Sequence, residues 1–444
     1  MLVRELRTRS LQAVSTFKII HVRFSKNTHQ RKLGVPACMF SGSSSTIIND
    51  RQGKRRSRHC LNSPPAPSHR DFTENVWHSS LCSHDESPVA LMEITPESPS
   101  FRVAAPIRER VRQYIANLPK DQPVPHLVGI LAETCDNQHT VEASREYAEE
   151  IADACKADGI RYTQHYLTNL TTVDHLKQAM EQILEQSPSI TGVLVFYPIF
   201  SLKRGPPKDV SVGVYFKSCD DAVRDLVSPK LDVEGLCGAY NARFLHRDPE
   251  YVVRLHEPSP FIFPCTPAAV VKLLQSYPDL FNTNLPMGSR FQSSVVTIIN
   301  RSDVVGRPLA AMLHNDGASK VYSIDENSIL LYQDRTLTDK IIPICRDDPQ
   351  LYLEHLQRCI QESNIIISGV PQENFVIPSD WLVGQGRQPK TLVNVAHVKN
   401  FCAEELAETN LRYIPSVGKI TVAMVLHNLI ELHERQRLAK KFKP

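Results

Sequence analysis

The chain has 444 residues, 41% of them hydrophobic, and a formal net charge of +3, which suits a globular protein of two domains with an additional tail. Residues 1–91 hold 14 Lys and Arg against 6 Asp and Glu, a balance of +8, so the remaining 353 residues carry −5 and give no reason to expect nucleic-acid binding. No apolar run approaches the roughly 18 residues that a membrane span needs. The 11 cysteines form an odd set without a C-x-x-C pair, which argues against a disulfide framework and a structural zinc site and favours a reducing intracellular compartment.

Residues 1–98 predict a disordered extension, because they are rich in Ser, Pro, Arg and His and show no sustained periodicity. The first thirty residues carry six basic side chains against the single acid Glu5, a composition typical of mitochondrial presequences. The basic, Pro-broken run from Lys54 to Arg70 has no helical face and speaks against that interpretation. Two hypotheses stay open: a targeting presequence, or a dispensable extension upstream of a translation start at Met92.

From residue 99 a regular alternation of helices and strands predicts an α/β domain with right-handed crossovers. We expect helices at 107–118, 140–157 and 173–184, and strands at 126–132, 160–167 and 192–195. Gly159 marks the end of the second helix. The Pro-containing segment 201–260 predicts an irregular loop region over the site.

A second set of elements follows a connecting helix expected at 268–274. Strands are expected at 295–299, 320–324, 364–371 and 392–397, with a helix whose apolar positions run from Val304 to Leu313. The last helix, expected at 422–433, has the length and apolar face to pack back on the first domain.

The stretch from Ser293 to Asp325 has the order strand, turn, helix, strand, acid, which is that of a dinucleotide-binding unit. Backbone N–H groups at the helix start can hold a pyrophosphate, and Gly306 would let the main chain approach it. Asp325 lies 19 residues past Gly306, where an acid that bonds the ribose hydroxyls is expected, and it would repel a 2′-phosphate. The turn reads N-R-S-D-V-V-G-R-P and not G-x-G-x-x-G. The alternative is an ordinary βαβ unit in which Asp325 only caps a helix beginning at Asn327.

Seven motifs in order, between about residues 99 and 438, resemble the methylenetetrahydrofolate dehydrogenases, and specifically their monofunctional NAD-dependent fungal branch. They are Tyr147 in REYAEEIADACKADGI, VFYPIF at 195–200, DVEGL at 232–236, PCTP at 264–267, NRSDVVGRP at 300–308, SGVP at 368–371 and IPSVGKITVAM at 414–424. The resemblance implies oxidation of 5,10-methylenetetrahydrofolate to the methenyl form with hydride transfer to NAD⁺, in one-carbon and purine metabolism. It also implies an α/β fold of two domains, a homodimer and a cytoplasmic location, or a mitochondrial one if the extension is a presequence.

The implied organisation is a disordered extension at 1–98, a catalytic folate-binding α/β domain at 99–266 completed by a C-terminal helix at 421–444, and a Rossmann-type NAD-binding domain at 267–420. The residues implied as catalytic are Tyr147, Glu234 and Cys265. Those implied to bind the folate are Tyr147, Phe196, Pro198, Asp232, Glu234, Pro415 and Gly418. Those implied to bind NAD are Thr266, Arg301, Ser302, Gly306, Ile324, Asp325, Gly369, Val370, Pro371 and Thr421, and no metal is expected.

Each assignment has a plainer alternative. Tyr147 could be a core aromatic, Glu234 a solvated loop acid with Asp232 as its rival, and Cys265 a small buried hydrophobe. Ile151 stands where the bifunctional members of the family have a lysine, and Phe196 where they have a glutamine, so no cyclohydrolase activity is expected. Two other functions stay open: a bifunctional enzyme that hydrolyses the methenyl product by other groups, and a non-catalytic NAD-binding regulatory protein.

Overall fold

The computed structural model describes most of the chain from residue 98 onward. The predicted N-terminal extension up to residue 97 and most of the predicted loop at 201–260 lie outside the described residues. The described ranges are 98–134, 141–187, 189–201, 218–240, 261–326, 328–333, 340–342, 349–372, 374–382, 390–406 and 410–441.

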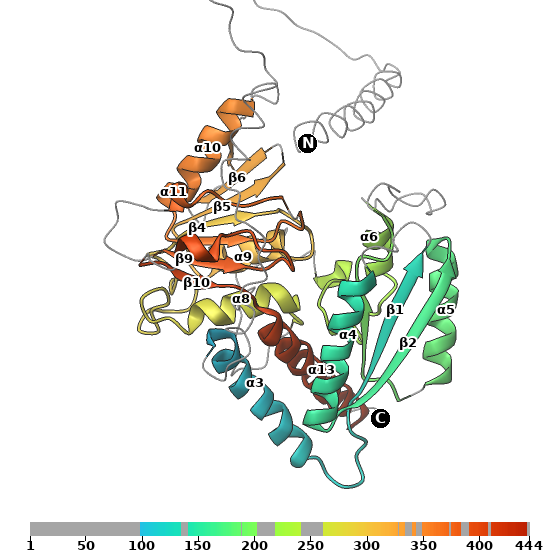
Figure 1. Cartoon of the computed structure of the whole chain (residues 1–444). Coiled ribbons are helices and arrows are strands. Elements are labelled where there is room, and N and C mark those ends of the chain that lie inside the picture. The colour runs from blue at the N-terminus through green and yellow to red at the C-terminus, as the bar shows by residue number, and fades with distance from the viewer. Residues whose placement is uncertain are drawn as a thin grey trace, which may run out of the picture. The chain divides into compact units, whose positions relative to one another are not determined.

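The first sheet has three parallel strands in the order β2-β1-β3 (Figure 1). Its strands are β1 (His126–Thr134), β2 (Arg161–Leu170) and β3 (Gly192–Phe196), and the helices α4 (Val141–Asp158) and α5 (Val173–Gln186) connect them. Side chains of β1 alternate between two cores: Leu127 and Leu131 pack in the cluster that includes α4, whereas Val128 and Ile130 pack in the one that includes α5. The sheet is thus covered on both faces, as a parallel sheet must be.

Local signals in the sequence set the ends of these helices. Gly159 has φ +75° directly after α4, a conformation that a residue with a Cβ adopts only with strain. The Thr172 hydroxyl accepts a hydrogen bond from the His175 amide at 3.1 Å and so caps α5. Both boundaries agree with the predictions within two residues.

The second sheet has seven strands in the order β10-β9-β8-β4-β5-β6-β7. The pairs from β10 to β5 are parallel, whereas β6 and β7 are antiparallel. The chain leaves β4 toward β5 on one side and later returns to β8 on the other, so the connections diverge between β4 and β8. The seven strands are β4 (Val295–Ile299), β5 (Lys320–Asp325), β6 (Ser328–Gln333), β7 (Lys340–Ile342), β8 (Ile365–Ser368), β9 (Thr391–Asn394) and β10 (Arg412–Ile414).

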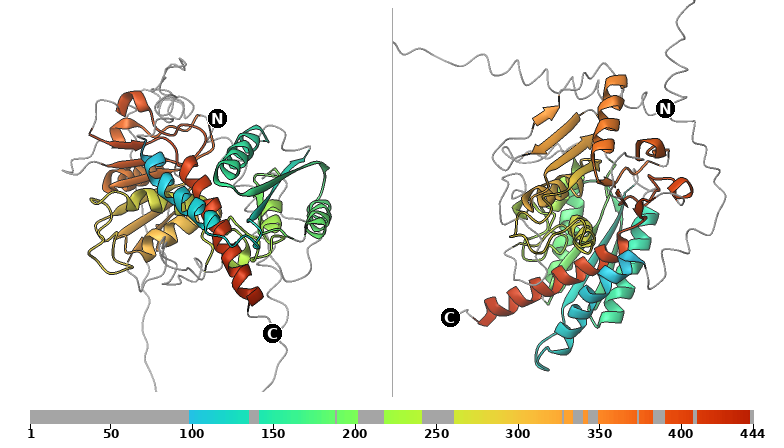
Figure 2. Two further views of the ribbon diagram at one scale, coloured as in Figure 1. Left: turned by 90° about the horizontal axis from the view of Figure 1, so that it is seen from below. Right: turned by 90° about the vertical axis from the view of Figure 1, so that its left-hand side faces the viewer.

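Helices α3 (Pro99–Ala116), α8 (Cys265–Gln275) and α13 (Gly418–Lys441) belong to one continuous apolar cluster that includes residues of both sheets. α13 packs on α3, α8 and α4, and Figure 2 shows α3 and α13 side by side. The Gln436 amide of α13 also donates to the carbonyls of Thr191 and Lys230, at 2.9 and 3.1 Å.

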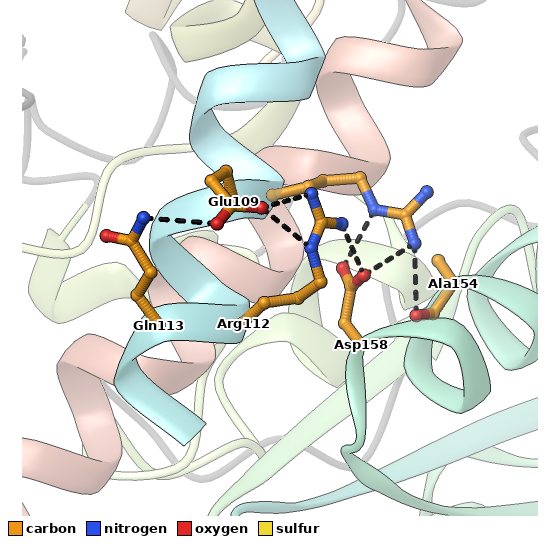
Figure 3. A network of polar contacts seen from close by, with 6 residues as sticks. Glu109, Arg112, Gln113, Ala154 and Asp158 are labelled. Carbon is orange, nitrogen blue, oxygen red and sulfur yellow. Dashed lines mark hydrogen bonds and ion pairs between the residues drawn. The ribbon is translucent and has the colours of Figure 1, made fainter. Parts of the chain in front are cut away.

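A polar network fastens α3 to the end of α4. The buried carboxylate of Asp158 accepts Arg108 Nε at 2.8 Å and Arg112 Nη1 at 2.9 Å. Arg112 also bonds Glu109 on its own helix, at 2.7 Å (Figure 3). Because a buried carboxylate left without partners is costly, this pairing fixes how α4, the helix of Tyr147 and Ile151, lies on α3.

Three expectations differ from the structure. α3 begins at Pro99 and runs through Pro106, since Ser98 caps it (its Oγ accepts the Phe101 amide at 3.3 Å) and apolar burial offsets the bond that proline loses. The helix α6 (Cys219–Arg224) lies within the segment predicted as irregular. The alternative of a helix after Asp325 is wrong, because β6 pairs antiparallel with β5 there; Asn327 itself lies outside the described residues.

The sequence analysis did not predict the strands β6, β7 and β10 of the second sheet. It also did not predict the 14-residue helix α10 (Pro349–Glu362) or the short helices α11 (Ser379–Leu382) and α12 (Ala403–Leu406).

Candidate active site

An apolar wall forms where α4 faces the end of β3. The partly buried Tyr147 ring meets Phe196 edge to face, with centroids 5.7 Å apart and an interplanar angle of 81°. Ile151 lies one helical turn after Tyr147 and is 0% exposed. Pro198, two residues past Phe196, is exposed and follows a cis peptide bond. Tyr147 is the partly exposed ring of this wall and Phe196 and Ile151 are buried behind it, and none of the three side chains is an ammonium that could activate water.

The loop after α6 is shaped by Asp232. Its buried carboxylate accepts the amides of Glu234, Gly235 and Cys237 at 3.0, 2.9 and 2.8 Å. Gly235 has φ +67°, and a Cβ there would lie 2.6 Å from the Ile262 carbonyl oxygen, so only glycine fits. Burial raises the pKa of Asp232, while the hydrogen bond from the Cys237 amide counteracts it. The carboxylate of Asp232 is therefore committed to the turn, and the side chain of Glu234 is the acid that the turn presents.

Glu234 is partly buried beside β3. Burial, and then the Asp232 carboxyl, raise the pKa of Glu234 well above its usual range, against the effects of a hydrogen bond with the Val195 backbone and the charge of Arg224. Burial of this kind favours the protonated form of a carboxyl, and that form can donate a hydrogen bond. The interpretation of Glu234 as a fully solvated loop acid does not fit this position.

Cys265 is the first residue of α8 and is buried. Its Sγ–H donates to the Val233 carbonyl at 3.3 Å, and Sγ lies 3.3 Å from Asn428 Nδ2. Burial and then the neighbouring carboxyls of Glu234 and Asp232 raise the pKa of the Cys265 thiol well above its usual value. Cys265 is thus a neutral thiol and not a nucleophilic thiolate.

These residues come together at one place. Burial, and after it the electrostatic influence of Cys265 and Glu234, raise the pKa of Tyr147 well above its usual value, and such an influence requires proximity. Thr266 follows Cys265 in the first turn of α8 and is partly exposed.

A second group gathers where the connections diverge between β4 and β8, the position at which open parallel sheets bind ligands. Asn300, directly after β4, has φ 86°, and its Nδ2 donates to the Gly369 carbonyl at 2.6 Å. The Gly369 amide donates to the Ile299 carbonyl at 3.0 Å. Val370 is partly buried and Pro371 exposed. The ends of β4 and β8 are thus joined, and Asn300 is a residue that the motif analysis did not single out.

The turn into α9 (Gly306–Asn315) differs from the expectation in its details. The Ser302 hydroxyl accepts the amides of Val305 and Gly306 at 3.2 and 3.3 Å and so holds the turn before α9, whose N-cap residue is Val305. A Cβ on Gly306 would lie 2.2 Å from the Asn300 carbonyl oxygen. The close approach of the protein's own backbone is therefore sufficient to require glycine at this position.

Arg301 links β5 to β6. Its Nε donates to Ser323 Oγ at 3.2 Å, its Nη1 to Ser328 Oγ at 3.0 Å, and its Nη2 to the carbonyls of the same two serines at 2.6 and 2.8 Å. Burial lowers the pKa of Arg301, and the nearby charge of Asp325 opposes that shift. The guanidinium holds the hairpin, so it is not a free anion-binding group.

Asp325 ends β5 with its side chain 45% exposed and Oδ2 4.0 Å from Arg301 Nη1. Its Oδ1 accepts the neighbouring Glu326 amide at 3.0 Å, which leaves lone pairs for a ligand hydroxyl. Ile324 is buried, and its carbonyl accepts the Asn300 amide at 3.2 Å. The end of β5 is thereby tied to the turn after β4.

Two buried asparagines that the sequence analysis missed hold the loops after β8 and β9. Asn400 Oδ1 accepts the Val370 amide at 3.1 Å, and its Nδ2 donates to the Val370 carbonyl at 3.0 Å. Asn394 Oδ1 accepts the Asn400 amide at 3.0 Å. Asn394 is the last residue of β9, and an asparagine at a strand end was the signal that could have indicated it, whereas Asn400 lies six residues further along the loop.

The segment from Pro415 into α13 connects three helices. The Gly418 amide donates to Ser416 Oγ at 3.1 Å, and Thr421 Oγ1 donates to the Val417 carbonyl at 3.2 Å. Lys419 Nζ lies 3.3 Å from Glu150 on α4. The Ser100 hydroxyl on α3 donates to the Ser416 carbonyl at 2.5 Å. Pro415 and Gly418 are thus held near the helix that carries Tyr147. The Thr421 hydroxyl donates its hydrogen bond to the backbone at the start of α13.

In the described part of the chain, no group of three or more His, Cys, Asp or Glu side chains is arranged to hold a metal ion. Among the helices described, none has both the length and the apolar character to cross a membrane.

Two family descriptions match the chain. "Tetrahydrofolate dehydrogenase/cyclohydrolase, catalytic domain" matches residues 100–211, and "Tetrahydrofolate dehydrogenase/cyclohydrolase, NAD(P)-binding domain" matches residues 264–437. The first match contains Tyr147 and Phe196, and the second contains Cys265 and Asp325.

The chain is 33% identical over 340 residues to the methylenetetrahydrofolate dehydrogenase [NAD(+)] of Schizosaccharomyces pombe, covering 76% of this chain and 92% of the relative. The solved NAD-dependent 5,10-methylenetetrahydrofolate dehydrogenase of Saccharomyces cerevisiae superposes with a TM-score of 0.61 at 29% identity, covering 77% of this chain and 98% of that one. The bifunctional protein FolD of Pelobacter propionicus is 25% identical, covering 75% of this chain and 95% of the relative.

Proposed function

Because the chain belongs to the tetrahydrofolate dehydrogenase/cyclohydrolase family, we propose that it oxidises 5,10-methylenetetrahydrofolate to 5,10-methenyltetrahydrofolate, with NAD⁺ as hydride acceptor and without cyclohydrolase activity. The observation that carries this proposal is the similarity along 92% of the NAD-dependent relative from S. pombe. The site agrees with it, because Ile151 and Phe196 make an apolar wall beside Tyr147.

The chemistry asks little acid–base work of the protein. Loss of hydride from the carbon between two nitrogens leaves a cation that both nitrogens share, so the site must mainly orient the folate and exclude water. Tyr147 supplies a ring face for the pterin, and Phe196 and Ile151 close the wall behind it. The raised pKa of Glu234 favours its protonated form, which would donate a hydrogen bond to the pterin. Cys265 and Thr266 begin α8 next to this carboxyl.

The residues of the second sheet fit NAD better than NADP. Asp325 carries a half-exposed carboxylate at the end of β5, where it can accept from both ribose hydroxyls. Arg301 gives its guanidinium to Ser323 and Ser328, so it has no fork to offer a 2′-phosphate. When bound, NAD⁺ would supply the two-electron acceptor. Gly369 and Val370 would border it at the point where the connections diverge.

For the other named residues we propose less direct roles. Ser302, Gly306 and Ile324 shape the NAD-binding turn through contacts within the chain, whereas Pro371, being exposed, is available to the cofactor. Pro198, Pro415 and Gly418 would border the folate, and Asp232 would act through the turn that it holds. Thr421 would contribute by fixing the start of α13.

We also propose the division into domains at 99–266 and 267–420, with 421–444 completing the first domain, which the packing of α13 on α3 and α4 supports. We propose a homodimer from the membership of the family, and a cytoplasmic location from the free cysteines of the described residues. Light scattering would test the dimer. Mass measurement of the natural N-terminus would show whether residues 1–91 remain, and so test the mitochondrial alternative.

The central experiment is a paired assay with 5,10-methylenetetrahydrofolate and either NAD⁺ or NADP⁺, followed by the absorbance of the methenyl product. We expect turnover with a preference for NAD⁺, and a decay of added methenyltetrahydrofolate no faster than in buffer. Binding of NAD⁺ without turnover would instead support a regulatory protein, and accelerated decay would support a bifunctional enzyme.

A further inference from the structure

The strongest unassigned feature is a buried amide on the C-terminal helix. Asn428 lies on α13 and is 3% exposed. Its Nδ2 donates to the Val233 carbonyl at 2.8 Å and to the Phe263 carbonyl at 3.0 Å. The chain separates Asn428 from these partners by 195 and 165 residues. One side chain therefore joins two segments that are remote in sequence.

Both segments end in residues of the proposed active site. Val233 directly precedes Glu234, and Phe263 lies two residues before Cys265. An amide nitrogen has two hydrogens, and each has a carbonyl acceptor here. The Val233 carbonyl also accepts the Cys265 thiol at 3.3 Å, while Asn428 Nδ2 lies 3.3 Å from the same sulfur. Asn428 thus connects the backbone next to Glu234 with the thiol of Cys265 through a single set of hydrogen bonds.

We infer that Asn428 is a positioning residue of the dehydrogenase site, which fixes the Glu234 turn relative to the start of α8. This inference rests on the proposed function and adds to it a residue that acts without touching folate or cofactor. The turn is held at one end by Asp232, which accepts the Glu234 amide at 3.0 Å. Asn428 Nδ2 donates to the carbonyl oxygen of the same Val233–Glu234 peptide at 2.8 Å, so both polar groups of that peptide are held by buried side chains. With both in place, the backbone at Glu234 cannot rotate without breaking a buried hydrogen bond.

The direction of the effect follows from the alternatives. Asn428→Leu keeps the volume approximately but removes the amide donor from two carbonyls, so that the turn loses two buried hydrogen bonds and can move. Asn428→Ser keeps one donor. A displacement of about 1 Å at a reacting centre can cost about 100-fold in rate. We expect kcat to be highest for the unchanged protein, lower for Asn428→Ser and lowest for Asn428→Leu, which should lose about 10- to 100-fold. The affinity for NAD⁺ should change less than about twofold in both variants.

Gln436 provides a matched control on the same helix. Its Nε2 also donates to two carbonyls, of Thr191 and Lys230, at 2.9 and 3.1 Å. Gln436→Met removes the same number of donors from α13, although from partly exposed hydrogen bonds, and neither of its acceptors adjoins Glu234 or Cys265. We expect it to retain the kcat of the unchanged protein.

The experiment measures kcat and KM for the folate, the Kd of NAD⁺ and the midpoint of urea unfolding, for the full chain and the three variants. If the unchanged protein does not reduce NAD⁺, the proposed function fails, and this inference fails with it. If the unchanged protein is active, a fall in kcat confined to the Asn428 variants supports the inference. Equal kcat values for Asn428→Ser and Gln436→Met, at similar unfolding midpoints, would overturn it. Should Asn428→Leu not fold, Asn428→Ser against Gln436→Met still decides.

Discussion

The cofactor preference can be traced to one carboxylate, and Asp325→Ser tests it. An ionised carboxylate that accepts hydrogen bonds from ribose hydroxyls contributes about 1.5–3 kcal/mol. Because about 1.4 kcal/mol corresponds to a factor of ten, this substitution should lower kcat/KM for NAD⁺ by roughly 10- to 100-fold. The side chain is 45% exposed, so the lower part of that range is the better expectation.

For NADP⁺ the same change acts in the opposite direction. Two unit charges about 4 Å apart near a protein surface repel by about 4 kcal/mol, and exposure and salt reduce this to roughly 1–2 kcal/mol. Removing the carboxylate should therefore raise kcat/KM for NADP⁺ by about 10-fold. Arg301 lies 4.0 Å from Asp325, but its four hydrogen bonds to Ser323 and Ser328 keep it from turning to a phosphate. The ratio of kcat/KM for NAD⁺ to that for NADP⁺ should therefore be smaller in Asp325→Ser than in the unchanged protein, but NAD⁺ should remain the preferred cofactor.

The assay compares kcat/KM for both cofactors at saturating folate, and Glu326→Ser is its control. Glu326 adjoins Asp325 and is exposed, so its loss changes the local charge equally without removing the proposed ribose contact. The reasoning is refuted if Asp325→Ser leaves the ratio of the two cofactors unchanged. It is also refuted if Glu326→Ser shifts that ratio as far as Asp325→Ser does.

Three further substitutions test the rest of the site. Glu234→Gln should lower kcat by more than about tenfold. Because the pKa of Glu234 is raised in the folded protein, the unchanged protein loses stability as the pH rises above the ordinary carboxyl pKa near 4.3. The stability of the variant relative to the unchanged protein, measured by urea unfolding, should therefore increase from about pH 4 toward alkaline pH, and a difference that is constant with pH would contradict this. Ile151→Lys places an ammonium at a 0% exposed position and should lower the free energy of unfolding by about 3 kcal/mol or more. This loss should be larger at low pH, because burial lowers the pKa of a lysine. Ile151→Met is the control, and an equal loss of stability for both variants would refute the charge argument. Gly306→Ala brings a Cβ 2.2 Å from the Asn300 carbonyl oxygen; it should lower the free energy of urea unfolding by roughly 1–3 kcal/mol and also weaken NAD⁺ binding. Gly369→Ala, whose Cβ would have its nearest contact at 3.8 Å, should lower stability less. The reverse order of stabilities would show that the turn at Gly306 relaxes.

The long elements were predictable because their signals are local. Strand β4 was expected at residues 295–299 and has those bounds, since a short β-branched run between polar turns reads as a buried parallel strand. Helix α4 shows a 3.6-residue apolar repeat and a terminal glycine. The hairpin β5–β6 was not predicted, because its stability comes from Arg301, a residue more than twenty positions upstream that bonds both strands. No window of sequence around Ser328 contains that information.

The site shows the same limit more sharply. Residue types at motif positions indicated Tyr147, Glu234 and Asp325 as ligand-binding candidates, but not which of them a ligand could still reach. Asp232, Ser302 and Arg301 carry groups suited to bind a ligand, and the structure shows those groups used by the protein's own backbone and side chains. A polar group that satisfies the chain has fewer hydrogen bonds left for a ligand. Hydrogen bonds between segments remote in sequence therefore separate residues that shape the site from those that face it, and Asn428, more than 160 positions from its acceptors, belongs to the first kind.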